Sequence, residues 1–332
     1  MHPSHRENPV EPFVRPDVRT YLDRQRDRPH VLGTAEILPQ MRKMSAEALG
    51  KLDAPAGEVA VMRDLVIPGA AGDLQARFFD ARSERDPGPV VIYIHGGGFS
   101  NLGIATHTPL TCEIARRLDL PVVSVSYRLA PENPWPAAPD DVEAVSRWIA
   151  ANGAVFDREF TGLVLAGDSA GGNLAAVTAL AFRDVPAPLP VLLQVLLYPK
   201  LDWGGDYESF DLFCNGYGMD EQNIRIHDVH YAPDIEHWRA SPVRTGQGGM
   251  PATLMVTASL DPLRDEGRAY AARCAEAGAS RRILVHCELH KLAVGACRAR
   301  TMDSDAPSIR ARSIRTNRAP RDPRPAGPPR HQ

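Results

Sequence analysis

The chain has 332 residues, of which 43% are hydrophobic, and its formal net charge is −3. This size and apolar content suit one large α/β domain with additions, and the balanced charge excludes a global basic field for nucleic acid. The sequence contains no run of 18 apolar residues, and its first residues lack the apolar core of a signal peptide. We therefore expect a cytoplasmic protein that binds neither nucleic acid nor membrane.

The cysteines and histidines do not form a metal-binding pattern. Five cysteines are widely spaced and show no C-x-x-C pair, which predicts reduced thiols instead of a disulfide framework or a zinc site. His227, His230 and His237 lie close in the sequence, but their spacing resembles a metal cluster only loosely. We expect no metal and no cofactor.

The first part of the chain differs from the rest in its charge and its predicted secondary structure. Residues 1–60 are charged and predict helices around 18–23 and 41–49, which form a helical cap segment in front of the core. Residues 61–68 and 74–80 then predict two strands joined by a glycine-containing turn, an antiparallel start to a sheet.

Strands and helices alternate through the rest of the core. Strands are predicted at 89–95, 121–127, 161–166, 191–198, 251–258 and 282–288, and helices at 108–118, 139–152, 172–181 and 264–278. Such alternation predicts an α/β fold with a mostly parallel central sheet and helices on both faces. Residues 202–242 break the alternation and predict an inserted cap or pocket segment near the active site.

The most informative motif is Gly167-Asp168-Ser169-Ala170-Gly171, a G-x-S-x-G sequence between a predicted strand and a predicted helix. In that setting the motif predicts a nucleophile elbow, a strained turn that lifts the Ser169 hydroxyl clear of the sheet. Glycine is needed at 167 and 171 because a Cβ there would meet the neighbouring strand and helix. The helix start also places N–H groups and a positive dipole end beside an oxyanion.

A second glycine motif, His95-Gly96-Gly97-Gly98, comes at the end of the predicted strand at 89–95. We interpret it as an oxyanion hole in which the amides of Gly97 and Gly98 donate together with that of Ala170. A flexible loop or a phosphate-cradling loop is the alternative. The phosphate loop would require a Gly-Lys-Ser/Thr ending, which this motif lacks.

An acidic residue after a later strand is the expected partner for a serine nucleophile. Asp261 lies just past the strand predicted at 251–258, and Pro262 opens the next helix. Asp261 also fits the role of a helix N-cap, and the two roles are compatible. Asp265 lies within the helix and is the weaker candidate, a surface or salt-bridging residue.

Four motifs together resemble the hormone-sensitive-lipase branch of the α/β-hydrolases, the bacterial carboxylesterases and acetyl hydrolases. They are His95-Gly96-Gly97-Gly98-Phe99, Tyr127-Arg128-Leu129-Ala130-Pro131-Glu132, Gly167-Asp168-Ser169-Ala170-Gly171-Gly172-Asn173 and Asp261-Pro262-Leu263-Arg264-Asp265-Glu266-Gly267. The resemblance covers roughly residues 60–285. It implies a Ser169 nucleophile, an Asp261 partner, and an oxyanion hole formed by Gly97, Gly98 and Ala170.

The same resemblance implies a substrate class. It suggests a serine carboxylesterase that hydrolyses small, short- to medium-chain acyl esters through an acyl-enzyme intermediate, working as a monomer or homodimer. An amidase or acyltransferase would share the acyl-enzyme chemistry, so the motifs leave those activities open.

The histidine of the expected triad is less clearly marked. His290 lies 29 residues after Asp261 and is the first candidate, although Lys291 comes next where the family has glycine. Val294 stands where the family's His-Gly step would place a histidine, and His286 within the predicted strand is a further candidate. Loss of this base would give the main alternative, a catalytically impaired hydrolase fold that at most binds a ligand.

The end of the chain departs from the family pattern. Residues 298–332 contain nine arginines and six prolines, a composition that predicts a disordered tail after a catalytic domain at 61–297. Because the resemblance stops abruptly near residue 289, we expect a shifted reading frame there and a lost natural C-terminus.

Overall fold

The computed structural model describes residues 12–26, 37–53, 55–278 and 282–287. The candidate base His290, the position Val294 and the tail predicted at 298–332 lie outside the described residues.

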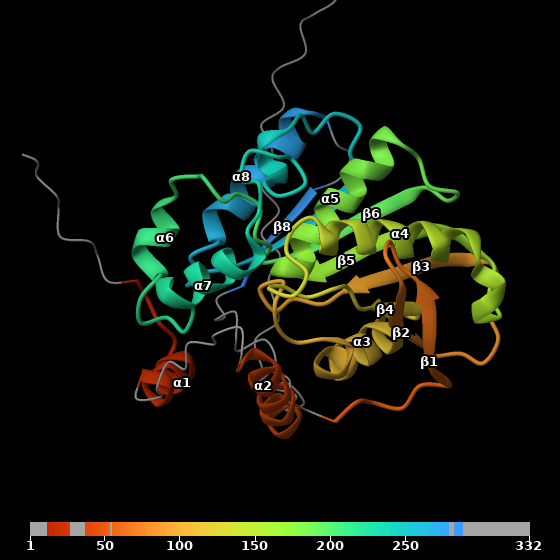
Figure 1. The fold of residues 1–332 in the computed structure, drawn as a ribbon, viewed down its shortest axis with the longest axis horizontal. Helices are drawn as coiled ribbons and strands as arrows, with labels where there is room; N and C mark the ends of the chain where they lie inside the picture. The colour runs from red at the N-terminus through yellow and green to blue at the C-terminus, as the bar shows by residue number, and fades with distance from the viewer. Residues whose placement is uncertain (1–11, 27–36, 54, 279–281, 288–332) are drawn as a thin grey trace, which may run out of the picture.

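An eight-stranded sheet, in the order β1-β2-β4-β3-β5-β6-β7-β8, forms the centre of the fold (Figure 1). β2 is antiparallel to both of its neighbours, and every later pair in the order is parallel. The mostly parallel α/β sheet expected from the sequence is therefore confirmed. The strands are β1 (Val61–Pro68), β2 (Asp73–Asp80), β3 (Gly88–Ile94), β4 (Val122–Val125), β5 (Phe160–Asp168), β6 (Val191–Leu197), β7 (Ala252–Ala258) and β8 (Arg282–Cys287).

Helices cover both faces of this sheet. They are α1 (Pro16–Arg26), α2 (Leu38–Leu52), α3 (Ile104–Leu118), α4 (Ala137–Ala151), α5 (Ala170–Asp184), α6 (Glu208–Phe213), α7 (Glu221–Tyr231) and α8 (Arg264–Glu276), with 3-10 turns at Gly153–Phe156 and Pro242–Arg244. No helix in the described ranges is both long and apolar enough to cross a membrane.

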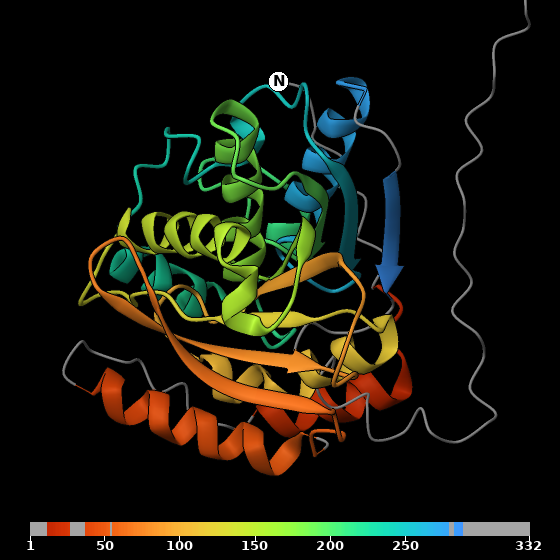
Figure 2. The ribbon, with the colours of Figure 1, turned by 90° about the vertical axis from the view of Figure 1, so that its right-hand side faces the viewer.

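The alternation of side chains along β3 explains the two layers of helices. Ile92 and Ile94 point into the cluster that contains the buried residues of α4, α5 and α8, whereas Val91 and Tyr93 point into the cluster beneath α3. Figure 2 shows α3 on the opposite side of the sheet from α4 and α5. Because both faces are covered, β3 is apolar at consecutive positions, as central parallel strands are.

Most predicted elements are confirmed with ends that differ by at most three residues, but the predicted start of α3 and the predicted end of β4 were wrong. α3 begins at Ile104, four residues before the predicted start, because the Thr106 hydroxyl bonds both the N–H and the carbonyl of Gly103 and closes the first turn. β4 ends at Val125, before the predicted end at Tyr127, whose hydroxyl donates to the carbonyl of His95 at 2.9 Å. In both cases a side-chain contact that apolar periodicity does not encode lies at or near the boundary.

The N-terminal helices lie at the edge where the parallel strands end. Val18 and Leu22 of α1 pack with Phe213 of α6 and with Leu260, which comes after β7. These contacts place α1 beside the inserted helix α6 and next to the loop that carries Asp261 (Figure 1).

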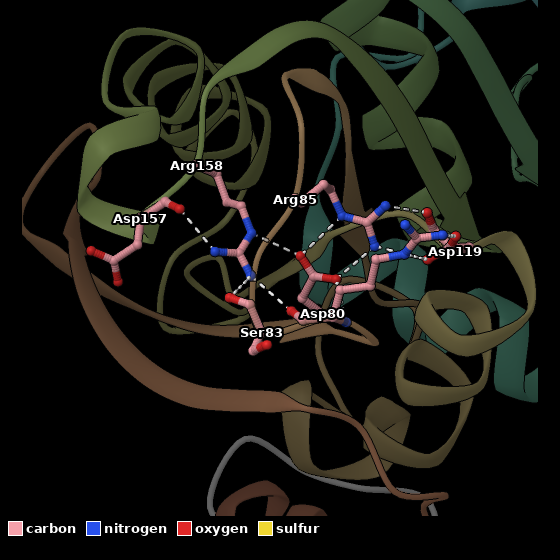
Figure 3. A network of polar contacts seen from close by, with 7 residues as sticks. Asp80, Ser83, Arg85, Asp119, Asp157 and Arg158 are labelled. Atoms are coloured by element: carbon pink, nitrogen blue, oxygen red, sulfur yellow. Dashed lines mark hydrogen bonds and ion pairs between the residues drawn. The ribbon is translucent and has the colours of Figure 1, made fainter.

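A buried ion cluster braces the opposite edge of the sheet (Figure 3). Asp80 at the end of β2 is fully buried and accepts from Arg85 at 2.7 Å and from Arg158 at 2.9 Å. Arg85 also donates to the carbonyl of Asp119 at 2.6 Å. Burial by itself would raise the pKa of Asp80, but the hydrogen bonds and charges of these arginines hold it below the ordinary value.

Candidate active site

Ser169 occupies the sharp turn between β5 and α5. Its backbone has φ 54° and ψ −118°, which is a left-handed φ that non-glycine residues rarely adopt. Neighbouring backbone holds this conformation, because the Ser169 N–H donates to Leu197 at 2.8 Å and its carbonyl accepts from Lys200 at 3.3 Å. A strained serine between a strand and a helix is the geometry of a nucleophile elbow.

The two glycines of the elbow allow a very close approach to β3. A Cβ on Gly171 would lie 2.0 Å from the carbonyl oxygen of Ile94 and 2.7 Å from that of His95. A Cβ on Gly167 would lie 2.3 Å from the Gly171 carbonyl oxygen. The predicted steric need for glycine at both positions is confirmed, and the elbow rests directly on the end of β3.

The glycine loop begins where the elbow touches β3. Gly97 and Gly98 both have positive φ, 119° and 60°, which suits glycine. The Gly97 carbonyl accepts the amides of Ser100 at 3.2 Å and Asn101 at 2.9 Å, so the loop folds back on itself. A Cβ on Gly97 would lie 2.0 Å from the carbonyl oxygen of Asn101, which leaves no room for another residue.

Helix α7, within the inserted segment, packs over this loop. The Tyr231 ring stacks on Phe99 with centroids 3.8 Å apart and an 8° angle between the planes. Nδ1 of His227 lies 2.7 Å from the Ser100 hydroxyl, and a Cβ on Gly98 would lie 2.4 Å from the His227 ring. His227 therefore borders the candidate oxyanion hole. The sequence pointed to His227 only as a loose metal candidate, since nothing local shows which loop a helix will cover.

His95, the first residue of the glycine motif, is part of the packing beneath the loop. It is 1% exposed and its ring stacks on Tyr127 with centroids 4.4 Å apart. Burial, helped by the nearby charge of His107, lowers the pKa of His95 to about 4, so its ring is neutral at pH 7. Its Nδ1 lies 2.8 Å from the Gly96 carbonyl oxygen.

Asp261 lies in the loop after β7 and is 1% exposed. One carboxylate oxygen accepts the Leu263 N–H at 2.9 Å, and its carbonyl accepts the Arg264 N–H at 3.0 Å. These bonds close the turn that leads into α8. The N-cap of α8 is Leu263, two residues later, so the predicted N-cap role of Asp261 was wrong. Asp265 lies inside α8 and pairs with Arg264 at 2.7 Å and Arg268 at 3.1 Å, as expected of a salt-bridging residue.

The topology gathers these loops at one edge of the sheet. Ser169, the glycine loop and Asp261 come after β5, β3 and β7, which run parallel, so their carboxyl ends meet at the same edge. His286 lies in β8, where its backbone pairs with Thr257 of β7.

Within the described ranges, no three His, Cys, Asp or Glu side chains gather in an arrangement that could hold a metal ion. Of the three histidines weighed as a loose metal cluster, His227 contacts Ser100, and His237 packs edge-on against Trp135.

The chain is similar to known esterases in both sequence and fold. Residues 91–291 match the family described as alpha/beta hydrolase fold. The esterase LipI of Mycobacterium tuberculosis is 36% identical over 222 residues, covering 65% of this chain and 69% of that protein. The ethyl acetate hydrolase of Pseudomonas putida is 32% identical over 268 residues, which cover 77% of this chain and 81% of that protein.

A solved structure extends the likeness to the tertiary level. An ester hydrolase from the metagenome of Lake Arreo, bound to a bipyridine phosphonate derivative, superposes with a TM-score of 0.79 at 32% identity, covering 86% of this chain and 94% of that one. The named relatives are esterases and hydrolases, so nothing among them favours a ligand-binding protein without activity. The chain therefore belongs to the α/β-hydrolases, and within them to the hormone-sensitive-lipase-like bacterial carboxylesterases.

Proposed function

We propose that this carboxylesterase hydrolyses short- to medium-chain acyl esters with Ser169 as its nucleophile. The observation that carries the proposal is the pairing of a strained Ser169, with φ 54°, and a glycine loop that starts where the elbow touches β3. An acyl-transfer site requires a nucleophile and backbone donors within reach of one carbonyl group, and this juxtaposition supports that requirement.

In the proposed reaction, Ser169 Oγ attacks the ester carbonyl carbon while a histidine takes the hydroxyl proton. The tetrahedral intermediate collapses, the C–O bond to the alcohol breaks, and the histidine returns the proton to the departing alcohol. Water then attacks the acyl-enzyme while the same histidine takes its proton. The acyl–Oγ bond breaks, the histidine returns the proton to Ser169, and the carboxylic acid leaves. Every atom comes from the ester, water and the protein, so the reaction needs no cofactor.

Three backbone amides are the proposed donors to the oxyanion, those of Gly97, Gly98 and Ala170. Ala170 is the first residue of the 15-residue helix α5. The amides of a first helical turn have no carbonyl partner inside the helix, and the dipole there favours negative charge. Loss of one such donor costs about 3–4 kcal/mol of transition-state stabilisation in comparable enzymes.

We assign the other triad positions to Asp261 and His290. Asp261 would orient the imidazole and stabilise its charged form, which suits a carboxylate buried to 1% exposure. His290 remains a proposal from chain order and spacing, with His286 as its rival.

The substrate proposal rests on the family and on the relative named ethyl acetate hydrolase, which supports short acyl groups. We further propose that the helical segment at 1–60 caps the acyl pocket, supported by the packing of α1 beside Leu260. A cytoplasmic location is supported by the buried free thiols of Cys112 and Cys214. A monomer or homodimer is proposed from the family resemblance alone. Cell fractionation would test the location, and light scattering would test the oligomeric state.

The test is burst-phase hydrolysis of p-nitrophenyl acetate and butyrate by the wild type and by Ser169→Ala, His290→Ala and His286→Ala. We expect turnover to vanish in Ser169→Ala and in His290→Ala, and to persist in His286→Ala. Ser169→Ala that turns over at the wild-type rate would overturn the proposed nucleophile. Loss of turnover in His286→Ala but not in His290→Ala would move the base to residue 286.

A further inference from the structure

One carboxylate oxygen connects the nucleophile turn to the glycine loop. Oδ1 of Asp168, the residue before Ser169, accepts the Gly96 N–H at 3.0 Å and the Tyr93 hydroxyl at 2.9 Å. Nε2 of His107 lies 3.2 Å from the same oxygen. Asp168 is 8% exposed, so these groups satisfy a carboxylate that water barely reaches.

The contacts of His107 favour a proton on both of its ring nitrogens. Nδ1 lies 3.1 Å from the carbonyl oxygen of Gly103, and a carbonyl oxygen can only accept. Nε2 faces the Asp168 carboxylate, which also can only accept. The Thr106 hydroxyl also lies 2.9 Å from Nδ1, and because it donates to the Gly103 carbonyl at 2.8 Å, its oxygen faces Nδ1 as an acceptor. An imidazolium paired with the Asp168 carboxylate satisfies all of these acceptors.

The charges of the neighbouring groups agree with this description. Burial opposes a charge on His107, but the Asp168 carboxylate outweighs it and raises the pKa of His107 above its ordinary value. Burial would likewise raise the pKa of Asp168, yet the His107 charge and the three contacts lower it to about 2. His95, whose ring lies 5.7 Å from that of His107, stays neutral, so the pocket holds one compensated ion pair.

The Asp168 carboxylate packs against Gly96, the residue that comes just before the two loop amides. A Cβ on Gly96 would lie 2.3 Å from Oδ2 of Asp168, so the carboxylate packs directly on the backbone there. The amides of Gly97 and Gly98 come immediately after Gly96, and the loop beyond is closed on itself through the Gly97 carbonyl. A shift of the carboxylate would therefore reach the backbone that carries both loop amides.

We propose that His107 is a positioning residue for the oxyanion hole: its Nε2–H group holds the Asp168 carboxylate against the Gly96 amide and so aims the Gly97 and Gly98 amides. The inference rests on the proposed esterase function. His107 touches no reacting atom, and its effect passes through Asp168 to the backbone.

The test compares His107→Leu, which removes the donor, with His107→Gln, which keeps an N–H donor near Nε2 without the charge. Thr111→Val is the matched control, because Thr111 is a fully buried residue of the same helix whose hydroxyl bonds only helix carbonyls. Each variant is measured for kcat and KM with p-nitrophenyl butyrate. Each is also measured for inhibition by butylboronic acid, which forms a tetrahedral adduct with a serine hydroxyl.

We expect His107→Leu to lower kcat about 30-fold and to weaken boronate inhibition by a similar factor, with KM changed less than twofold, because the lost interaction acts in the tetrahedral state. His107→Gln is expected to stay within about threefold of the wild type, and Thr111→Val within twofold. A packing role alone would lower the yield of folded enzyme without a matched fall in kcat and boronate affinity.

If His107→Leu fails to fold, Tyr93→Phe replaces it in the comparison, because it removes another donor to the same carboxylate oxygen of Asp168. We then expect kcat and boronate affinity to fall together by about fivefold. Unchanged kcat and boronate affinity in His107→Leu, or in Tyr93→Phe if it must stand in, would overturn the inference and leave the esterase function standing. Absence of Ser169-dependent turnover in the wild type would overturn both.

Discussion

Arg42 of α2 donates a hydrogen bond from Nε to the carbonyl oxygen of Ser100 at 2.8 Å, which joins the N-terminal helices to the glycine loop. The same guanidinium donates to the carbonyl of Ala130 at 2.8 Å and pairs in a bidentate manner with Glu132. Arginine suits this position because its planar fork can serve several acceptors at once. α2 is thereby fixed to two of the loops that border the candidate site.

Arg42→Ala should remove the contact that holds the glycine loop to helix α2. It removes the donor to two backbone carbonyls, and we expect unfolding free energy to fall by about 1–2 kcal/mol and kcat/KM to fall about tenfold. Urea unfolding and p-nitrophenyl butyrate kinetics measure the two effects. Arg15→Ala is the control, because Arg15 pairs with Asp17 at the surface, where such pairs contribute less than about 1 kcal/mol. Wild-type kinetics in Arg42→Ala would contradict the role assigned to this contact.

Gly171→Ala should disrupt the elbow. The new methyl group would lie 2.0 Å from a carbonyl oxygen of β3, so the strand or the helix must shift, at a cost on the order of 3 kcal/mol. We expect esterase turnover to be lost even where the variant still folds. Gly50→Ala should have the opposite effect on stability. Gly50 lies in helix α2 with nothing within 4 Å of its Cβ position, so the free energy of unfolding should rise by roughly 0.5–1 kcal/mol. Thermal unfolding measures the change in melting temperature of both variants. Equal changes in Gly171→Ala and Gly50→Ala would show that the close approach of Gly171 to β3 is absent.

Asp80→Asn should weaken the fold without altering catalysis. It leaves the largely buried Arg85 and Arg158 without their shared anion, and removing one partner of a buried pair costs about 3–5 kcal/mol. The cluster lies at the edge of the sheet opposite Ser169, so kcat/KM of the folded enzyme should not change. Asp157→Asn is the matched control in the same region, because Asp157 is 77% exposed where it pairs with Arg63. A stable Asp80→Asn would refute the bracing role of this cluster.

His95 should make the protein sensitive to mild acid. Its pKa is about 4 in the folded protein and 6.5 ordinarily, so the stability that its neutral form contributes is fully present above pH 6.5 and is lost as the pH falls toward 4. Between pH 7 and pH 5 the loss is about 2 kcal/mol. The charged and titratable groups facing it are His107, Asp168 and Tyr127, and burial raises the pKa of Tyr127 so that it stays neutral in this range.

The variant His95→Gln cannot take up that proton. We expect its unfolding free energy, measured by urea titration at pH 7, 6 and 5, to fall by about 2 kcal/mol less than that of the wild type. Parallel curves for the two proteins would show that another group causes the acid sensitivity.

Local sequence patterns were enough to predict the order of strands and helices along the chain and the need for glycine at residues 167 and 171. Apolar runs and turn residues repeat with the geometry of the backbone, so the alternation from β3 to α8 could be predicted from the sequence. Steric demands at Gly167 and Gly171 also belong to a short local motif, which is why their need for glycine was predictable. The same patterns could not locate α6 and α7, whose mixed polarity in 202–242 lacks a clear period.

Contacts between distant loops were decided only by the tertiary structure. Asp168 and Gly96 are 72 residues apart, and Arg42 and Ser100 are 58 apart, so no local period relates them. His107 carried no signal in the sequence because its role depends on which carboxylate the parallel strands bring beside it. Periodic backbone geometry determines the elements of this protein, whereas the polar contacts around its site depend on how the folded sheet aligns the ends of β3 and β5.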